Sequence, residues 1–75
     1  MSTFDFYIRQ TETIAKRYYL NSKTGYSDIA FELVQSFIIE VMSDLDLSEQ
    51  NKKVINDTLK LRIELINEER RHLYD

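Results

Sequence analysis

The sequence predicts an all-α protein, and three observations lead to this prediction. The 75 residues contain no proline and only one glycine, so almost nothing interrupts helix formation. Apolar residues recur every three or four positions along most of the chain, which is the period of an amphipathic helix. Turn-forming residues gather at two places, 21–25 and 43–48. We therefore expect a single domain over residues 1–75, a three-helix bundle with helices at about residues 3–20, 28–45 and 49–73.

The first predicted helix begins next to Ser2, whose spacing from Asp5 is that of a capping box. Two acid-before-base pairs four residues apart, one of them Glu12 and Lys16, support the helix. Its apolar stripe is narrow, so we expect one buried face and one wet face. The stripe consists of Phe4, Tyr7, Ile8, Thr11, Ile14, Ala15 and Tyr18.

The second predicted helix follows a turn at Gly25, where a left-handed residue can end a helix, and Ser27 is its expected N-cap. At about 100° per residue its apolar side chains cover roughly 220° of the circumference, far more than an ordinary amphipathic stripe. Two neighbouring helices or a second chain must cover this arc. Its members are Ile29, Ala30, Phe31, Leu33, Val34, Phe37, Ile38, Val41, Met42 and Leu45.

The third predicted helix is capped by Ser48 and has no breaker as far as Leu73. At 1.5 Å per residue it would be roughly 37 Å long against about 27 Å for the second, so its end overhangs the bundle. The short connection predicts that the second and third helices form an antiparallel hairpin, with the first packed across them. Because 75 residues are near the lower limit for a self-sufficient core, we also expect a homodimer.

Arg62 is the most informative polar residue, because it projects from the apolar arc of the third predicted helix. Burying an unpaired guanidinium costs much free energy, so this group needs either an acidic partner or access to water. Glu40 and Asp44 on the second helix are two candidate partners, and Glu69 of a second, antiparallel copy is a third. Equally, the arginine stem can run along the surface and place its charge in water.

Charge is distributed unevenly along the chain, whose formal net charge is −3. Between Tyr26 and Asn51 there is no Lys or Arg, so an electrostatic partner of this segment should be basic. The alternative is charge matching between helices of the same chain. The acidic residues of the segment are Asp28, Glu32, Glu40, Asp44, Asp46 and Glu49.

The apolar excess and the acidic middle segment predict a small non-enzymatic interaction protein: an adaptor, inhibitor or regulatory factor that presents a helical surface to a larger protein with a basic surface. The alternative is a dimeric nucleic-acid-binding regulator that reads DNA with its third helix. The cations available to it are Lys52, Lys53, Lys60, Arg70 and Arg71. The residues predicted to form a partner or dimer interface are Phe6, Phe31, Ile39, Glu40, Arg62, Glu69 and Leu73.

Catalytic, cofactor-binding and metal-binding residues are not predicted. Cysteine is absent, and no phosphate-binding glycine loop is present. Glu69 and His72 have the Glu-x-x-His spacing of di-metal bundles, but one such motif with a single histidine is a weak signal. The first ten residues lack the basic and apolar regions of a signal peptide, and no uninterrupted apolar run is longer than the three residues of Phe37-Ile38-Ile39. We therefore expect a cytoplasmic protein without a membrane segment.

Overall fold

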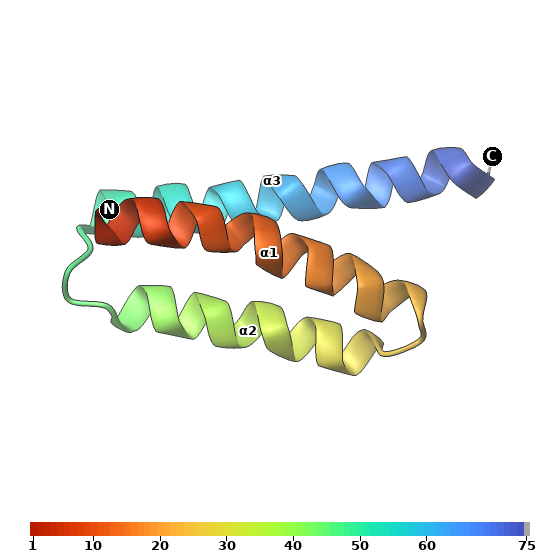
Figure 1. The fold of residues 1–75 in the computed structure, drawn as a ribbon, viewed down its shortest axis with the longest axis horizontal. Coiled ribbons are helices and arrows are strands. Elements are labelled where there is room, and N and C mark those ends of the chain that lie inside the picture. The colour runs from red at the N-terminus through yellow and green to blue at the C-terminus, as the bar shows by residue number, and fades with distance from the viewer. Residues whose placement is uncertain (75) are drawn as a thin grey trace.

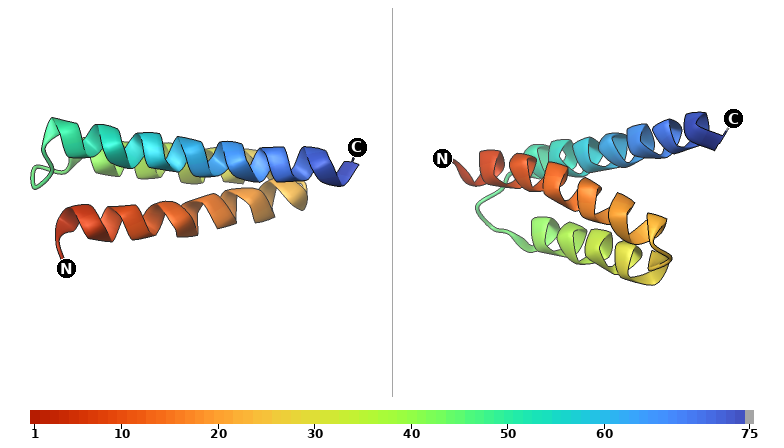
Figure 2. Two further views of the ribbon diagram at one scale, coloured as in Figure 1. Left: turned by 90° about the horizontal axis from the view of Figure 1, so that it is seen from above. Right: turned by 45° about the vertical axis from the view of Figure 1, so that its right-hand side comes forward.

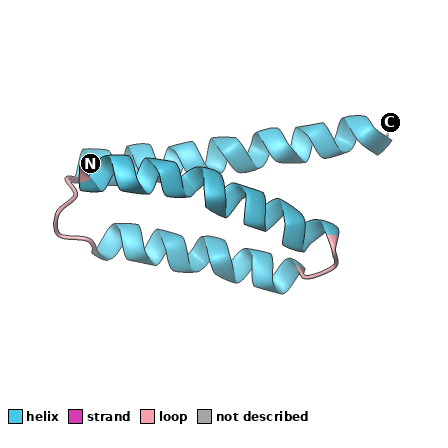
Figure 3. Cartoon of the chain, viewed as in Figure 1, coloured by secondary structure: helices cyan, strands magenta, loops and turns pink. Residues whose placement is uncertain are grey.

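The computed structural model describes residues 1–74 of the chain, and the side chains of residues 1–69. It consists of three helices: α1 (Thr3–Lys23), α2 (Ser27–Ser43) and α3 (Glu49–Tyr74) (Figure 1, Figure 3). The described part of the chain has no strands, so the all-α prediction is confirmed. None of the three helices combines the length and apolarity that crossing a bilayer requires in the described residues.

Side-chain capping explains where α1 and α3 begin. The hydroxyl of Ser2 accepts a hydrogen bond from the backbone N–H of Asp5, and that of Ser48 accepts one from the backbone N–H of Asn51, each at 3.1 Å. Both N-caps are as predicted. Gly25 has a left-handed φ of +90°, which the turn prediction requires. The prediction that Ser27 caps α2 is wrong, because Tyr26 is the N-cap and makes no side-chain cap bond. The backbone N–H of Tyr26 closes the turn on the carbonyl of Asn21 at 2.8 Å, so the helix starts one residue early.

The central helix of the bundle is α1. It contacts both α2 and α3 extensively, whereas α2 and α3 contact each other much less. Figure 1 shows that α2 runs opposite to the other two helices, and both views in Figure 2 show the end of α3 extending beyond α2. The predicted overhang is therefore present. A close α2–α3 hairpin is not confirmed, because α1 provides most of the contacts of both helices.

The core lies where α1 meets the other two helices. Tyr7 is buried within it, with its ring edge-on to that of Phe37 at a centroid distance of 6.0 Å. Every member of the apolar stripe predicted for α1 is buried or partly buried, which confirms that prediction. The buried apolar cluster consists of Tyr7, Ala15, Phe37, Val41, Leu47, Ile55 and Leu59.

Candidate interaction surfaces

One row of large apolar side chains on α2 faces solvent. Phe31, Ile38 and Met42 are 60%, 37% and 49% exposed, and at about 100° per residue they lie within roughly 40° of one another on the helix. Leu45, which follows the end of α2, is 96% exposed. We call these four residues the α2 surface. The two neighbouring helices therefore do not cover the wide apolar arc of α2.

The α2 surface borders a groove between α2 and α3. This groove has a volume of about 270 Å³, and Val34, Ile38, Leu59 and Ile63 give it an apolar lining. Asn56 lies in the same groove, with its amide nitrogen 3.5 Å from the sulfur of Met42. The groove exists because α2 and α3 make few direct contacts, so a strip of apolar surface between them stays accessible.

Asn56 brings an unsatisfied polar atom to this groove. Its side-chain oxygen Oδ1 is buried and has no hydrogen-bond donor among the described residues. Burying a carbonyl oxygen without a donor costs about 1–3 kcal/mol. The buried oxygen of Asn56 therefore lowers the stability of the folded chain, and folding alone does not require it.

The two helices beside the groove differ in the charges that they expose. α2 carries the acidic residues Asp28 and Glu32, which are exposed, and it has no Lys or Arg. On α3, Lys60 lines the groove, and Lys53 is exposed on the same side of that helix, seven residues earlier. Asp57 lines the groove beside Lys60, so the α3 edge carries both signs of charge, whereas the charged residues of α2 are all acidic.

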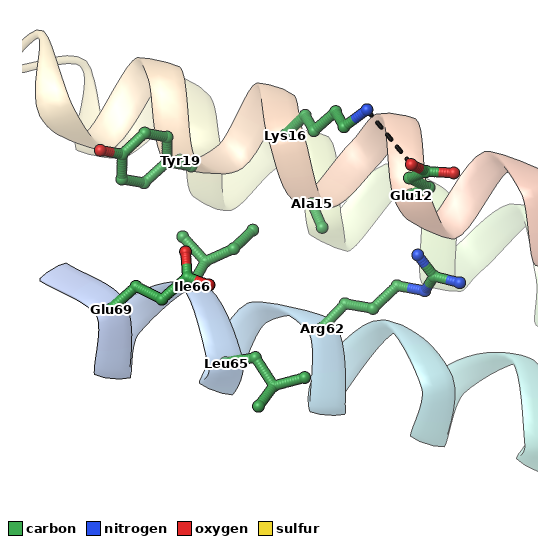
Figure 4. Close-up of a pocket in the computed structure, with 8 residues that line it drawn as sticks. All are labelled: Glu12, Ala15, Lys16, Tyr19, Arg62, Leu65, Ile66 and Glu69. Atoms are coloured by element: carbon green, nitrogen blue, oxygen red, sulfur yellow. Dashed lines mark ion pairs between the residues drawn. The ribbon is translucent and has the colours of Figure 1, made fainter.

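A second apolar row lies on α3, on the side away from α2. Val54, Leu61 and Leu65 are 41%, 56% and 51% exposed and lie within roughly 40° of one another. Beside this row, α1 and α3 diverge toward their C-terminal ends and leave a groove of about 410 Å³ (Figure 1). Figure 4 shows the residues that line it: Glu12, Ala15, Lys16, Tyr19, Arg62, Leu65, Ile66 and Glu69.

Arg62 lies against α1, and not against α2 as the predicted pairs with Glu40 or Asp44 required. Its side chain is partly buried and rises from α3 into the α1–α3 groove (Figure 4). It has no carboxylate within 4.0 Å among the described residues. Glu12, on the facing wall of the groove, forms an ion pair with Lys16 at 3.2 Å. The predicted pairs of Arg62 with Glu40 and with Asp44 are therefore absent, since the helix that faces Arg62 is α1 and not α2.

Asp44 has a different partner from the one predicted. The hydroxyl of Tyr7 donates a hydrogen bond to the carboxylate of Asp44 at 2.7 Å, linking α1 to the end of α2. This bond, together with a backbone hydrogen bond from Asp46, lowers the pKa of Asp44. Burial raises the pKa of Tyr7 to about 12, and the nearby carboxylate contributes to the shift. The Tyr7–Asp44 pair therefore has a structural role, because the side chain of Tyr7 is buried and its hydroxyl already donates its proton to Asp44.

The predicted interface residues do not form one continuous surface. Phe6 and Glu40 are brought together at a shallow groove of about 180 Å³ between α1 and α2. Phe31 belongs to the α2 surface, and Ile39 is 61% exposed on a different side of α2. Arg62 and Glu69 both line the α1–α3 groove without contacting each other, and the side chains of Leu73 and His72 lie outside those that the structure describes.

The α3 row of Val54, Leu61 and Leu65 was missed as a site by the sequence analysis. The signal was present, because positions 54, 58, 61 and 65 follow the helical spacing of a second stripe. It was hidden because the stripe that contains Ile55 and Leu59 is stronger and explains the helix by itself. No protein-family model, curated protein or solved structure matches the chain. Its function is therefore inferred from these surfaces and their charges.

Proposed function

We propose that this chain is a small non-enzymatic protein that binds a larger protein through the α2 surface. The observation that carries the proposal is the exposed row of Phe31, Ile38 and Met42 beside an apolar groove. Single exposed apolar side chains are ordinary, but a contiguous row next to a groove is typical of a helix-binding site. Adaptors, inhibitors and regulatory factors act through surfaces of this kind.

The partner element that fits best is an amphipathic helix with a basic flank. Its apolar face would lie along the α2–α3 groove, in contact with Ile38 and Met42. Its basic residues would meet Asp28 and Glu32, which lie on the α2 edge away from α3. In this complex, α2 and α3 serve together as the antiparallel platform that the sequence predicts, because the partner contacts both.

The alternative of a nucleic-acid reader on α3 has no specific observation in its favour among the described residues. Lys52, one of its five cations, is buried, and its Nζ lies 3.4 Å from the carboxylate of Glu49. Lys53 and Lys60 are exposed but seven residues apart on a helix that also exposes Asp57 and Glu64. The cations at 70 and 71 lie outside the described side chains.

Affinity purification of the tagged full chain from its native host, followed by mass spectrometry, tests the proposal. Phe31→Glu and Ile38→Glu should each abolish capture of the partner, because a carboxylate would replace an apolar contact. Leu20→Glu is the matched control, since Leu20 is as exposed as Phe31 at 60% but lies on α1. Helicity by circular dichroism confirms that all variants are folded. If the two α2 variants capture the same proteins as the wild type, the α2 surface is not the binding site.

A further inference from the structure

We propose that the α1–α3 groove is a homodimer contact, in which two copies of α3 cross antiparallel and Arg62 of each copy pairs with Glu69 of the other. This contact is made by α1 and α3 and shares no residue with the α2 surface or the α2–α3 groove. The inference therefore goes beyond the proposed function and does not depend on it. A dimer of this kind would present two α2 surfaces at once.

The charges of the groove are self-complementary. Its lining holds two cations, Lys16 and Arg62, and two carboxylates, Glu12 and Glu69, so a second copy of the groove offers the opposite charge for each. Glu12 and Lys16 already neutralise each other within the chain. Among the side chains of residues 1–69, neither Arg62 nor Glu69 has an ion-pair partner.

Helical geometry allows both ion pairs to form together. Arg62 and Glu69 are seven residues apart, which separates them by about 10.5 Å along α3 and only roughly 20° around it. A twofold axis between Leu65 and Ile66 brings Arg62 of each chain level with Glu69 of the other. In an antiparallel pair related by such an axis, the same flank of each helix faces the other, so the two side chains can meet.

The same charges oppose the neighbouring registers. A shift of one heptad in one direction would set Arg62 against Arg62, and a shift in the other direction would set Glu69 against Glu69. Both arrangements place like charges together and are unfavourable. Of these three registers, only the proposed one satisfies both charges.

An apolar centre lies between the two proposed ion pairs. Leu65 is 51% exposed and would contact Ile66 of the second copy, next to the twofold axis. The exposed row continues along α3 through Leu61, and the facing wall of α1 adds Tyr19 and Lys16 to the contact. A stable interface buries on the order of 800 Å² on each partner, which a helix face together with the adjoining groove can supply.

Sedimentation equilibrium of the purified full chain over a range of concentrations tests this proposal. The wild type should dimerise, and Arg62→Glu should weaken the dimer by at least about tenfold, because both symmetric contacts become repulsive. The double variant Arg62→Glu/Glu69→Arg should restore the wild-type affinity to within about threefold. Lys53→Glu is the matched control: it makes the same change of charge nine residues away, on the opposite side of α3, and should leave the dimer intact.

Three outcomes would overturn the proposal: a monomeric wild type at every concentration, an Arg62→Glu variant that dimerises normally, or a charge-swapped double variant that remains monomeric. Arg62 and Glu69 have no ion-pair partner among the described residues, so these variants should keep the wild-type helicity by circular dichroism. Phe31→Glu should still dimerise even though it loses the partner protein. The failure of one proposal can thus be told apart from the failure of the other.

Discussion

Two phenylalanines on α2 should respond very differently to replacement by alanine. Phe37 is 5% exposed and packs edge-on against Tyr7, whereas Phe31 is 60% exposed and belongs to the α2 surface. The two residues are of the same type and lie on the same helix, so replacement by alanine changes the helix propensity equally at both positions. The difference between their effects therefore measures how deeply each ring is buried in the folded chain.

The magnitudes follow from burial. Truncating a buried phenylalanine costs about 3–5 kcal/mol, because the apolar contacts are lost and a cavity remains. Less than half of the Phe31 side chain is buried, so Phe31→Ala should cost about 1 kcal/mol or less. A domain of this length has a total free energy of unfolding of about 4–11 kcal/mol. We therefore expect Phe37→Ala to remove a large part of the free energy of unfolding and Phe31→Ala to leave most of it.

Urea denaturation followed by circular dichroism at 222 nm measures both free energies. The experiment should be run at several protein concentrations, since dimerisation would make the free energy of unfolding itself depend on concentration. If Phe31→Ala costs as much as Phe37→Ala at the lowest concentration, Phe31 is buried within the single chain. That result would refute the exposed position of the α2 surface and remove the basis of the proposed function.

Three further predictions can be checked by the same denaturation measurement. The hydrogen bond from Tyr7 lowers the pKa of Asp44, so the folded state binds this proton less readily than the unfolded state. This difference in pKa stabilises the folded state above the ordinary aspartate pKa of 3.8, and the stabilisation is lost as the pH falls through the lower pKa of the folded state. Tyr7→Phe should make the free energy of unfolding less dependent on acid pH. An unchanged pH profile would contradict the stabilising role of the Tyr7–Asp44 hydrogen bond. Asn56→Leu should raise the free energy of unfolding by about 1 kcal/mol by removing an unsatisfied buried oxygen, and a loss of stability would show that this oxygen is satisfied. Gly25→Ala should lower it by about 1 kcal/mol through backbone strain alone, because no atom lies within 4 Å of the added Cβ; a neutral result would mean that the turn is not left-handed.

Features set by residues close in sequence could be predicted well. The buried stripe of α1 follows from helical spacing, and the caps at Ser2 and Ser48 follow from one hydroxyl and a backbone N–H three residues away. Gly25 marks the first turn because glycine is the residue type that adopts a positive φ without a steric penalty. The error at Ser27 is a shift of one residue, which arises because the turn closes through the backbone of Tyr26.

Features set by the rotation of one helix against another could not be predicted. The sequence shows that Arg62 projects from an apolar arc, but not which neighbouring helix lies opposite it. A short connection made α2 and α3 the expected close neighbours, yet α1 takes most of the contact surface of both. Asp44 consequently meets Tyr7, and Arg62 faces Glu12 and Lys16 across a groove.

The position of α1 also accounts for the exposed apolar row on α2. A helix with one close neighbour buries the side chains facing it, which here include Ala30, Phe37 and Val41. The sparse contact with α3 covers little more, so an arc of roughly 220° extends well beyond the buried part. The exposed part of this row contributes little to folding, and contiguous exposed apolar surface promotes association. Folding therefore does not explain why these positions are apolar, whereas a partner that covers them does.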